Sequence, residues 1–274
     1  MKIGVIVRAF ARTPELVSGQ VQAVGKLIDA FEKLISREEI KKIDVVVPIN
    51  QIFVDVDCGQ TKKALEESTQ KDCVRIYNTQ YGLFCGLLNE AMARQIRDGC
   101  THSLIVSTGC VDYVTEDNIK GLTTAANDGA IATGLAIGEL SESILSGRIA
   151  NTFAMWNIEP LLAVGGFDLR AENAQADNRI QPFMRGKSTD GKDVFYPLAG
   201  VEEIIPLVRL VEMHDKCIKP VVPTSGLWKA PNPVVDPVGF KRHVAKMATK
   251  FERQSVFAHQ VSADFSFIEG GVMG

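Results

Sequence analysis

The sequence lacks an excess of charge of either sign. Its 274 residues include 30 lysines and arginines against 33 aspartates and glutamates, for a formal net charge of −3. A protein that neutralises many phosphates along a nucleic acid needs a basic surplus. The composition therefore argues against binding to DNA or RNA.

Long hydrophobic runs and a targeting segment are also missing. No stretch of about 18 consecutive apolar residues occurs, so no transmembrane helix is expected. The first apolar run is short and is broken by Arg8 and Arg12, which excludes a signal peptide as its explanation. The six cysteines form no C-x-x-C pair and predict free thiols rather than a disulfide framework or zinc site. We therefore expect a cytoplasmic protein.

Several standard nucleotide-binding and catalytic motifs are absent. There is no G-x-G-x-x-G after the first apolar run and no G-x-x-x-x-G-K-[ST], which argues against dinucleotide dehydrogenases and P-loop enzymes. There is also no G-x-S-x-G elbow and no H-E-x-x-H pair.

The first half of the chain alternates apolar runs with segments of helical period. The apolar runs predict strands at residues 3–7, 43–47, 74–77, 104–106 and 130–137. The helical period predicts helices at residues 17–35, 61–67, 83–96 and 118–126, the last of them capped by Thr115. This order predicts a three-layer α/β/α fold with a mostly parallel central sheet, whose ligands bind outside the carboxyl ends of the strands.

The second half has a different character. Residues 169–200 are polar with little periodicity, apart from a short strand pattern at residues 194–196, and are typical of a flexible lid or insertion. Helical period returns at residues 201–212. Prolines between residues 220 and 237 indicate an irregular connector, and residues 240–251 predict one basic amphipathic helix.

Four segments stand out in order along the chain. They are LLNEAMARQ with Asn89, STGCVD at residues 107–112, WNIEPLLAVGGFD at residues 156–168, and GVEEIIPLVRL at residues 200–210. This order resembles the family-2 glycosyltransferases with the GT-A fold. That family carries V-G-G-F-D, then an acidic pair with an arginine six positions after its second member. The resemblance covers roughly residues 1–222, and we expect residues 223–274 to form a C-terminal extension.

The acidic pair is the candidate catalytic group. Glycosyl transfer with inversion needs a carboxylate within hydrogen-bond reach of the acceptor hydroxyl. The resemblance implies that Glu203 is this general base and that Glu202 orients the loop. The alternative from the residues alone is that both carboxylates merely favour the N-terminus of a helix.

The resemblance also implies binding residues. Those on the donor side are Asp55 and Asp57 after the second strand, and Asn89. The loop after the first strand, with Arg8, Phe10 and Arg12, departs from the family's P-x-Y-N, and we expect it to bind the donor through its arginines. Those on the acceptor side are Trp156, Gly165, Gly166, Asp168 and Arg209. Arginine side chains suit phosphate oxygens, and the two glycines suit a tight turn beside an acceptor.

The family's metal-binding D-x-D is not preserved. Thr108 and Cys110 fall near its two positions, which leaves Asp112 as the remaining carboxylate for Mg²⁺ or Mn²⁺. Three alternatives follow: transfer without a metal and with arginines on the phosphates, a metal site rebuilt around Asp112, or loss of transferase chemistry.

The leading interpretation is a glycosyltransferase that moves a sugar from a nucleotide-sugar to a small-molecule or glycan acceptor, with residues 169–200 closing over the donor. The other is a catalytically degenerate GT-A-like protein that binds a nucleotide or glycan, or acts in assembly. A homo-oligomer is compatible with both.

Overall fold

The computed structural model describes residues 1–9, 11, 14–35, 40–47, 58–69, 71–77, 85–138, 141–145, 147–171, 183–187, 193–196, 201–226, 232–248 and 250–260. Its main feature is a sheet of seven strands in the order β3-β2-β1-β4-β6-β5-β9. The strands are β1 (Ile3–Arg8), β2 (Ile40–Val46), β3 (Val74–Tyr77), β4 (His102–Ser107), β5 (Ala132–Leu135), β6 (Phe153–Asn157) and β9 (Ile218–Val221). All neighbouring pairs are parallel except the two that involve β6.

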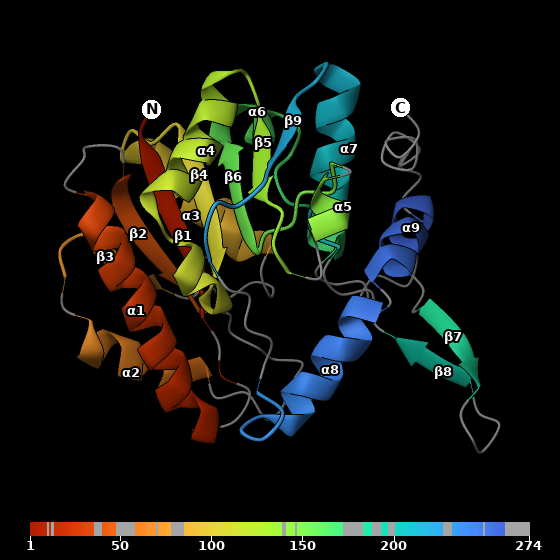
Figure 1. Ribbon diagram of the computed structural model, residues 1–274, viewed down its shortest axis with the longest axis horizontal. Helices are drawn as coiled ribbons and strands as arrows, with labels where there is room; N and C mark the ends of the chain where they lie inside the picture. Colours follow the sequence, from red (N-terminus) through yellow and green to blue (C-terminus); the bar gives the residue numbers. More distant parts are fainter. Residues whose placement is uncertain are drawn as a thin grey trace.

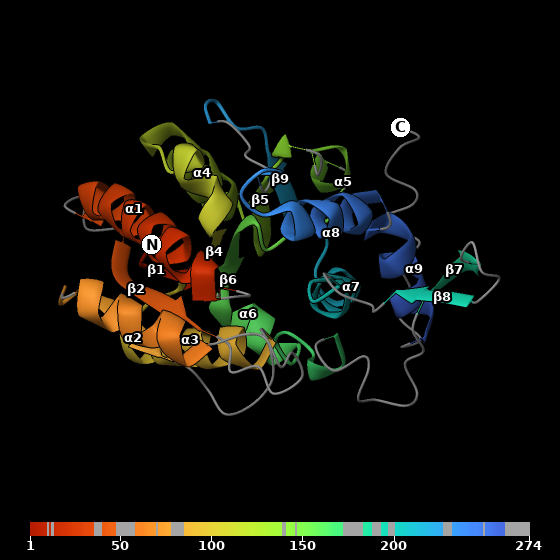
Figure 2. The same cartoon turned by 90° about the horizontal axis from the view of Figure 1, so that it is seen from below.

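Helices cover the sheet on both faces (Figures 1 and 2). The helices of the described residues are α1 (Val17–Ile35), α2 (Cys58–Ser68), α3 (Cys85–Arg97), α4 (Glu116–Asn127), α5 (Ser141–Leu145), α6 (Ile158–Ala163), α7 (Ile204–Met213), α8 (Pro237–Ala248) and α9 (Lys250–Gln260), of which α8 and α9 lie beyond the faces of the sheet. Short 3-10 turns lie at η1 (Pro14–Leu16), η2 (Thr108–Tyr113) and η4 (Leu169–Ala171). The three-layer α/β/α class predicted from the sequence is confirmed.

Two hydrophobic cores lie on opposite faces of the sheet because successive strand residues point in opposite directions. Val5 and Val7 of β1 pack with Leu27 and Phe31 of α1, on the face that α4 also covers. Ile6 between them packs on the other face, in a core built from α3, α6, α7 and part of α9.

The C-terminal region departs from the expectation of one helix. Two helices, α8 and α9, are present, and α9 packs against both α7 and α8. Phe257 and Ala258 of α9 are buried in the same core as Ile204 of α7. Helix α9 is thus part of the core that positions α7.

Two strands of the seven-stranded sheet, β6 and β9, are not predicted by the sequence pattern. The segment of β6 has no period-two pattern because both its faces are buried, so its sequence does not distinguish a strand from a helix. In β9, Pro220 was taken as part of a connector, but it lies on the last strand in the sheet order, where a proline is tolerated. Within residues 169–200, the described parts are η4 and a separate antiparallel pair, β7 (Phe183–Lys187) and β8 (Asp193–Tyr196), next to α9 in both views.

Candidate functional site

The chain runs from β1 outward to β2 and β3 on one side, and then crosses back to β4 on the other side of β1. The direction of the connections therefore reverses between β1 and β4. Such a switch point leaves a crevice beyond the carboxyl ends of the two central strands, where ligands of open α/β sheets bind. Arg8 and Ser107 are the last residues of β1 and β4 and are direct partners in the register. A ligand-binding site is therefore expected beside these two residues.

Arg8 connects three segments at this edge. Its Nη2 donates to the Ser107 hydroxyl at 3.1 Å and to the Asn151 carbonyl at 2.7 Å. Its Nη1 lies 3.1 Å from Oε1 of Glu202, and both side chains are about one-seventh exposed, at 15% and 14%. A guanidinium group therefore lies at the switch point with a carboxylate beside it, and both keep some access to solvent.

The two glutamates have different environments. Glu203 is only 3% exposed, and its Oε1 accepts a hydrogen bond of 2.6 Å from the Asn151 amide. Its Oε2 has no hydrogen-bond partner in the described part of the chain. Burial, and secondarily the neighbouring Glu202, raises the pKa of Glu203, while Lys250 acts in the opposite direction. This burial disagrees with the expected role of Glu203 as general base, because Glu203 is the buried member of the pair and Glu202 is the more exposed one.

Asn151 is the residue at this edge that sequence reasoning missed. It is fully buried, its backbone bonds both Arg8 and Glu203, and its Oδ1 accepts from Trp156 Nε1 at 2.9 Å. Its Nδ2 is buried without a hydrogen-bond partner in the part of the chain that is described. A lone asparagine before an apolar run carries no sequence signal of such a role.

The end of β4 offers few metal ligands. Cys110 is fully buried, and that burial raises the pKa of its thiol to about 12, so it remains protonated near neutral pH. The Thr108 hydroxyl is 3.5 Å from Gln20 Nε2 on α1, and Asp112 is half-buried. Among the described residues no group of three or more His, Cys, Asp or Glu side chains could hold a metal ion. The described donor set does not fit Mg²⁺ or Mn²⁺.

The V-G-G-F-D segment forms a tight turn after α6. Gly165 and Gly166 have φ of +95° and +66°, which residues with a Cβ rarely adopt. Asn89 of α3 holds the turn with both ends of its side-chain amide, which bond the carbonyl and the amide of Phe167 at 2.8 and 2.9 Å. Arg209 of α7 donates to the Val164 carbonyl at 2.8 Å.

Asp168 and Arg209 complete this turn with an ion pair of 3.6 Å, and their side chains are 15% and 39% exposed. The structure therefore brings Asn89, Gly165, Gly166, Asp168 and Arg209 together. The side-chain amide of Asn89 bonds the turn itself, whereas the side chains of Arg209 and Asp168 are partly exposed.

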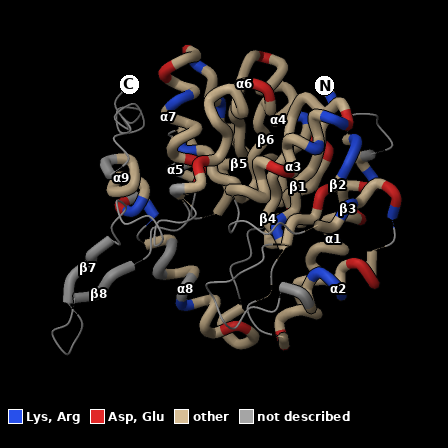
Figure 3. The backbone as a smooth tube through the Cα atoms, turned by 180° about the vertical axis from the view of Figure 1, so that it is seen from behind, with Lys and Arg blue, Asp and Glu red and all other residues tan. Residues whose placement is uncertain are grey.

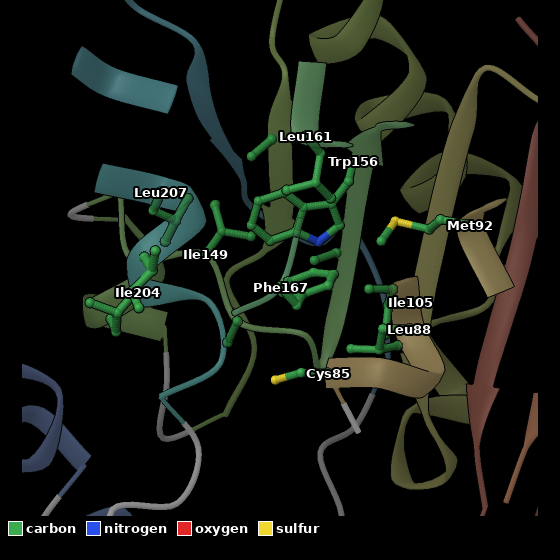
Figure 4. Close-up of a cluster of buried hydrophobic side chains, with 14 of the residues drawn as sticks. Cys85, Leu88, Met92, Ile105, Ile149, Trp156, Leu161, Phe167, Ile204 and Leu207 are labelled. Carbon is green, nitrogen blue, oxygen red and sulfur yellow. The ribbon is translucent and has the colours of Figure 1, made fainter. Parts of the chain in front are cut away.

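Trp156 lies in the core. Its side chain is fully buried, with its ring edge-to-face against Phe167 at 5.3 Å, and Leu161 and Ile149 lie around it (Figure 4). A ring with no exposed face cannot stack on an acceptor in this arrangement. The contribution of Trp156 is instead to hold Asn151 through its indole N–H.

Other expectations fall outside the described residues, namely those for Phe10, Arg12, Asp55 and Asp57. Along the described helices, Lys and Arg positions are interspersed with Asp and Glu positions (Figure 3). None of the helices in the described ranges is long and apolar enough to cross a bilayer.

Together these features define a three-layer α/β protein with a polar edge at the switch point of its sheet. No protein-family model matches the sequence, and no curated protein does so either. Among solved structures, the chain is similar to the mannosyltransferase PcManGT from Pyrobaculum calidifontis in complex with GDP-Man and Mn²⁺. The TM-score is 0.46 and the sequence identity is 11%, over 92% of this chain. The match spans 64% of the length of that protein, and the likeness concerns the fold alone.

Proposed function

We propose that the chain is a glycosyltransferase that binds a nucleotide-sugar at the carboxyl edge of β1 and β4 and transfers its sugar to an acceptor hydroxyl. The observation that carries this proposal is the Arg8–Glu202 pair, which puts a phosphate-binding side chain and a carboxylate 3.1 Å apart at the switch point. The sequence order of V-G-G-F-D and the acidic pair supports it.

Within the pair, we assign the general base to Glu202. Its side chain is 14% exposed at the edge, whereas Glu203 is buried and bonded to the Asn151 amide. A base must come within hydrogen-bond reach of the acceptor proton. This reverses the roles that the family pattern implies, and Glu203 becomes a positioning residue that holds the segment of Asn151.

The proposed transfer moves one proton, forms one bond and breaks one bond. The acceptor O–H gives its proton to a Glu202 carboxylate oxygen while its oxygen bonds to the anomeric carbon of the donor. The bond from that carbon to the diphosphate breaks, and its electron pair leaves on the diphosphate oxygen. When Arg8 turns from Glu202 to the diphosphate, it stabilises that charge and makes a carboxylate oxygen available to the acceptor.

The test uses Glu202→Gln with water as acceptor, measured as release of UDP or GDP from UDP- and GDP-linked hexoses. We expect turnover to fall by roughly 10²–10⁴, with donor affinity within a few-fold of the wild type. Glu212→Gln is the matched control, since Glu212 is an exposed carboxylate on α7 outside the site. A Glu202→Gln enzyme with wild-type turnover would overturn the assignment.

A second candidate function is binding of a nucleotide or glycan without turnover. It is favoured by Thr108 and the buried Cys110, which stand where the family carries metal-binding carboxylates. The same experiment separates the two: tight binding of a nucleotide-sugar with no release of UDP or GDP by the wild type supports the second.

A further inference from the structure

The inner face of α9 carries charged side chains that the proposed function has not used. Lys250, Arg253, Gln254 and Phe257 recur at three- and four-residue steps, and so lie on one face of the helix. They are 9%, 2%, 2% and 0% exposed. Phe257 shares a core with Ile204, and α9 contacts α7, so this face is turned toward the helix that begins at the acidic pair.

Buried cations are costly unless opposite charges lie nearby. The Lys250 ammonium interacts with the Glu203 carboxylate, and the Arg253 guanidinium interacts with Glu202. Since Glu202 is also paired with Arg8, three cations act on two adjacent carboxylates, one of them through a direct ion pair. Burial disfavours the charged form of Glu203, which raises its pKa and leaves the group of five with a positive surplus.

Unpartnered polar atoms occur on the segments that carry this group, namely on Glu203, on Asn151 that is bonded to it, and on α9 next to Arg253. Asn151 Nδ2 is a buried donor, and Glu203 Oε2 and Gln254 Oε1 are buried acceptors, none with a hydrogen-bond partner in the described residues. Buried polar groups of native proteins are nearly always satisfied, so three unsatisfied atoms on these segments indicate a missing polar partner. A partner with anionic oxygens and hydroxyl groups would match donors, cations and acceptors together.

We propose that α9 completes a phosphate-binding site at the switch point, in which Lys250 and Arg253 act with Arg8 to hold the diphosphate of a glycosyl diphosphate. The site deepens the proposed function and rests on it for the sugar. In this proposal the side chains of α9 supply positive charge that a metal ion would otherwise supply. The described residues at the end of β4 contain no set of ligands for such an ion.

The test is calorimetric titration of UDP, GDP and inorganic pyrophosphate into the full chain, with EDTA and then with Mn²⁺. We expect the wild type to bind equally well in EDTA. Lys250→Met and Arg253→Met keep the apolar stem but lose the charge, and each should weaken binding about 10- to 100-fold, as expected for a charged hydrogen bond. Lys241→Met on the exposed surface of α8 is the control and should bind as the wild type does.

Two results would overturn the proposal: loss of binding on chelation, or methionine variants with wild-type affinity. Lys250→Arg and Arg253→Lys retain the charge and should bind within a few-fold of the wild type. If they lose as much affinity as the methionine variants, charge is not the cause and the proposal fails. Should a methionine variant not fold, the chelation arm and these two variants decide the question.

Pyrophosphate contains neither sugar nor base, which separates this proposal from the proposed function. Binding of pyrophosphate that depends on Lys250 and Arg253, with no turnover of any nucleotide-sugar, supports the phosphate site and contradicts the transferase. Turnover with binding that is lost in EDTA supports the transferase and contradicts the phosphate site.

Discussion

Glu203 is a carboxyl group whose environment favours its neutral form. Its oxygens lie away from water, and Glu202 precedes it in the chain, so its pKa in the folded protein lies above the ordinary 4.5. The stability linked to this group is therefore fully present below the pKa of the unfolded chain and is lost as pH rises through the folded value. Its side chain holds the Asn151 segment, but the burial of its carboxyl group lowers the free energy of unfolding by an amount that increases with pH.

This gives a prediction for Glu203→Gln, which stays neutral at every pH and keeps an oxygen for the Asn151 amide. Relative to the wild type, the variant should become progressively more stable as pH rises from about 4 toward neutrality. Urea unfolding across this range measures the difference. A difference that does not change with pH, like that expected for the exposed Glu212→Gln, would show that Glu203 is charged in the folded protein.

Replacement of Gly166 is expected to destabilise the turn that Asn89 holds. Its φ is +66°, and a Cβ there would lie 2.6 Å from Asn89 Oδ1, which accepts from the Phe167 amide. Gly166→Ala should therefore cost about 1–3 kcal/mol for the backbone and more for the displaced hydrogen bonds.

Gly129→Ala is the matched control because its φ is +93° but a Cβ would meet nothing within 4 Å. We expect Gly166→Ala to be less stable than Gly129→Ala by at least about 1 kcal/mol, measured by urea unfolding. Equal losses would mean that the contact with Asn89 does not hold the turn.

Among the elements, α9 has the most consequence for the site, because its packing against α7 brings Lys250 and Arg253 near the acidic pair. Phe257 is its fully buried anchor in the core. Phe257→Ala should lower the free energy of unfolding by about 3–5 kcal/mol, as large-to-small changes in cores do.

Val244→Ala on α8 is the comparison, since that side chain is 48% exposed and its loss should cost no more than about 0.5 kcal/mol. Chemical unfolding of both variants provides the measurement. If the two changes cost the same, α9 is not docked on the core through Phe257.

The elements also show where sequence reasoning succeeds. The helix Val17–Ile35 and the strand Val74–Tyr77 were predicted with their observed bounds, because their periods of 3.6 and 2 are clear. Thr115 caps α4 as predicted, with its hydroxyl oxygen accepting from the Asn118 amide. By contrast, β6 was missed because its burial on both faces removes the alternation that identifies a strand.

The candidate site was less accessible to sequence reasoning. Two of the four segments that suggested it meet at Arg8, through Ser107 and Glu202, but exposure within the Glu202–Glu203 pair depends on tertiary packing. The contacts of Asn151, 52 residues from Glu203 and 143 from Arg8, likewise follow from the antiparallel placement of β6 beside β4. Helix periodicity places Lys250 and Arg253 on one face, but it does not say what that face meets.

For the molecule as a whole, the topology and the charged residues indicate the same location. The switch point between β1 and β4 selects one end of the sheet, and Arg8, Glu202, Glu203 and Asn151 all lie there. The C-terminal helices α8 and α9 lie beside this end, and α9 packs against α7 (Figure 1). The central claim is therefore that a nucleotide-sugar binds at this edge.

Hydrogen exchange with and without UDP- and GDP-linked hexoses at millimolar concentration tests that claim most directly, because it maps the ligand onto the chain. We expect slower exchange at the end of β1, in η2, at the start of α7 and in the first turn of α9, with α8 unchanged. Slower exchange confined to α8 or to β9, or no change anywhere with any donor, would contradict it.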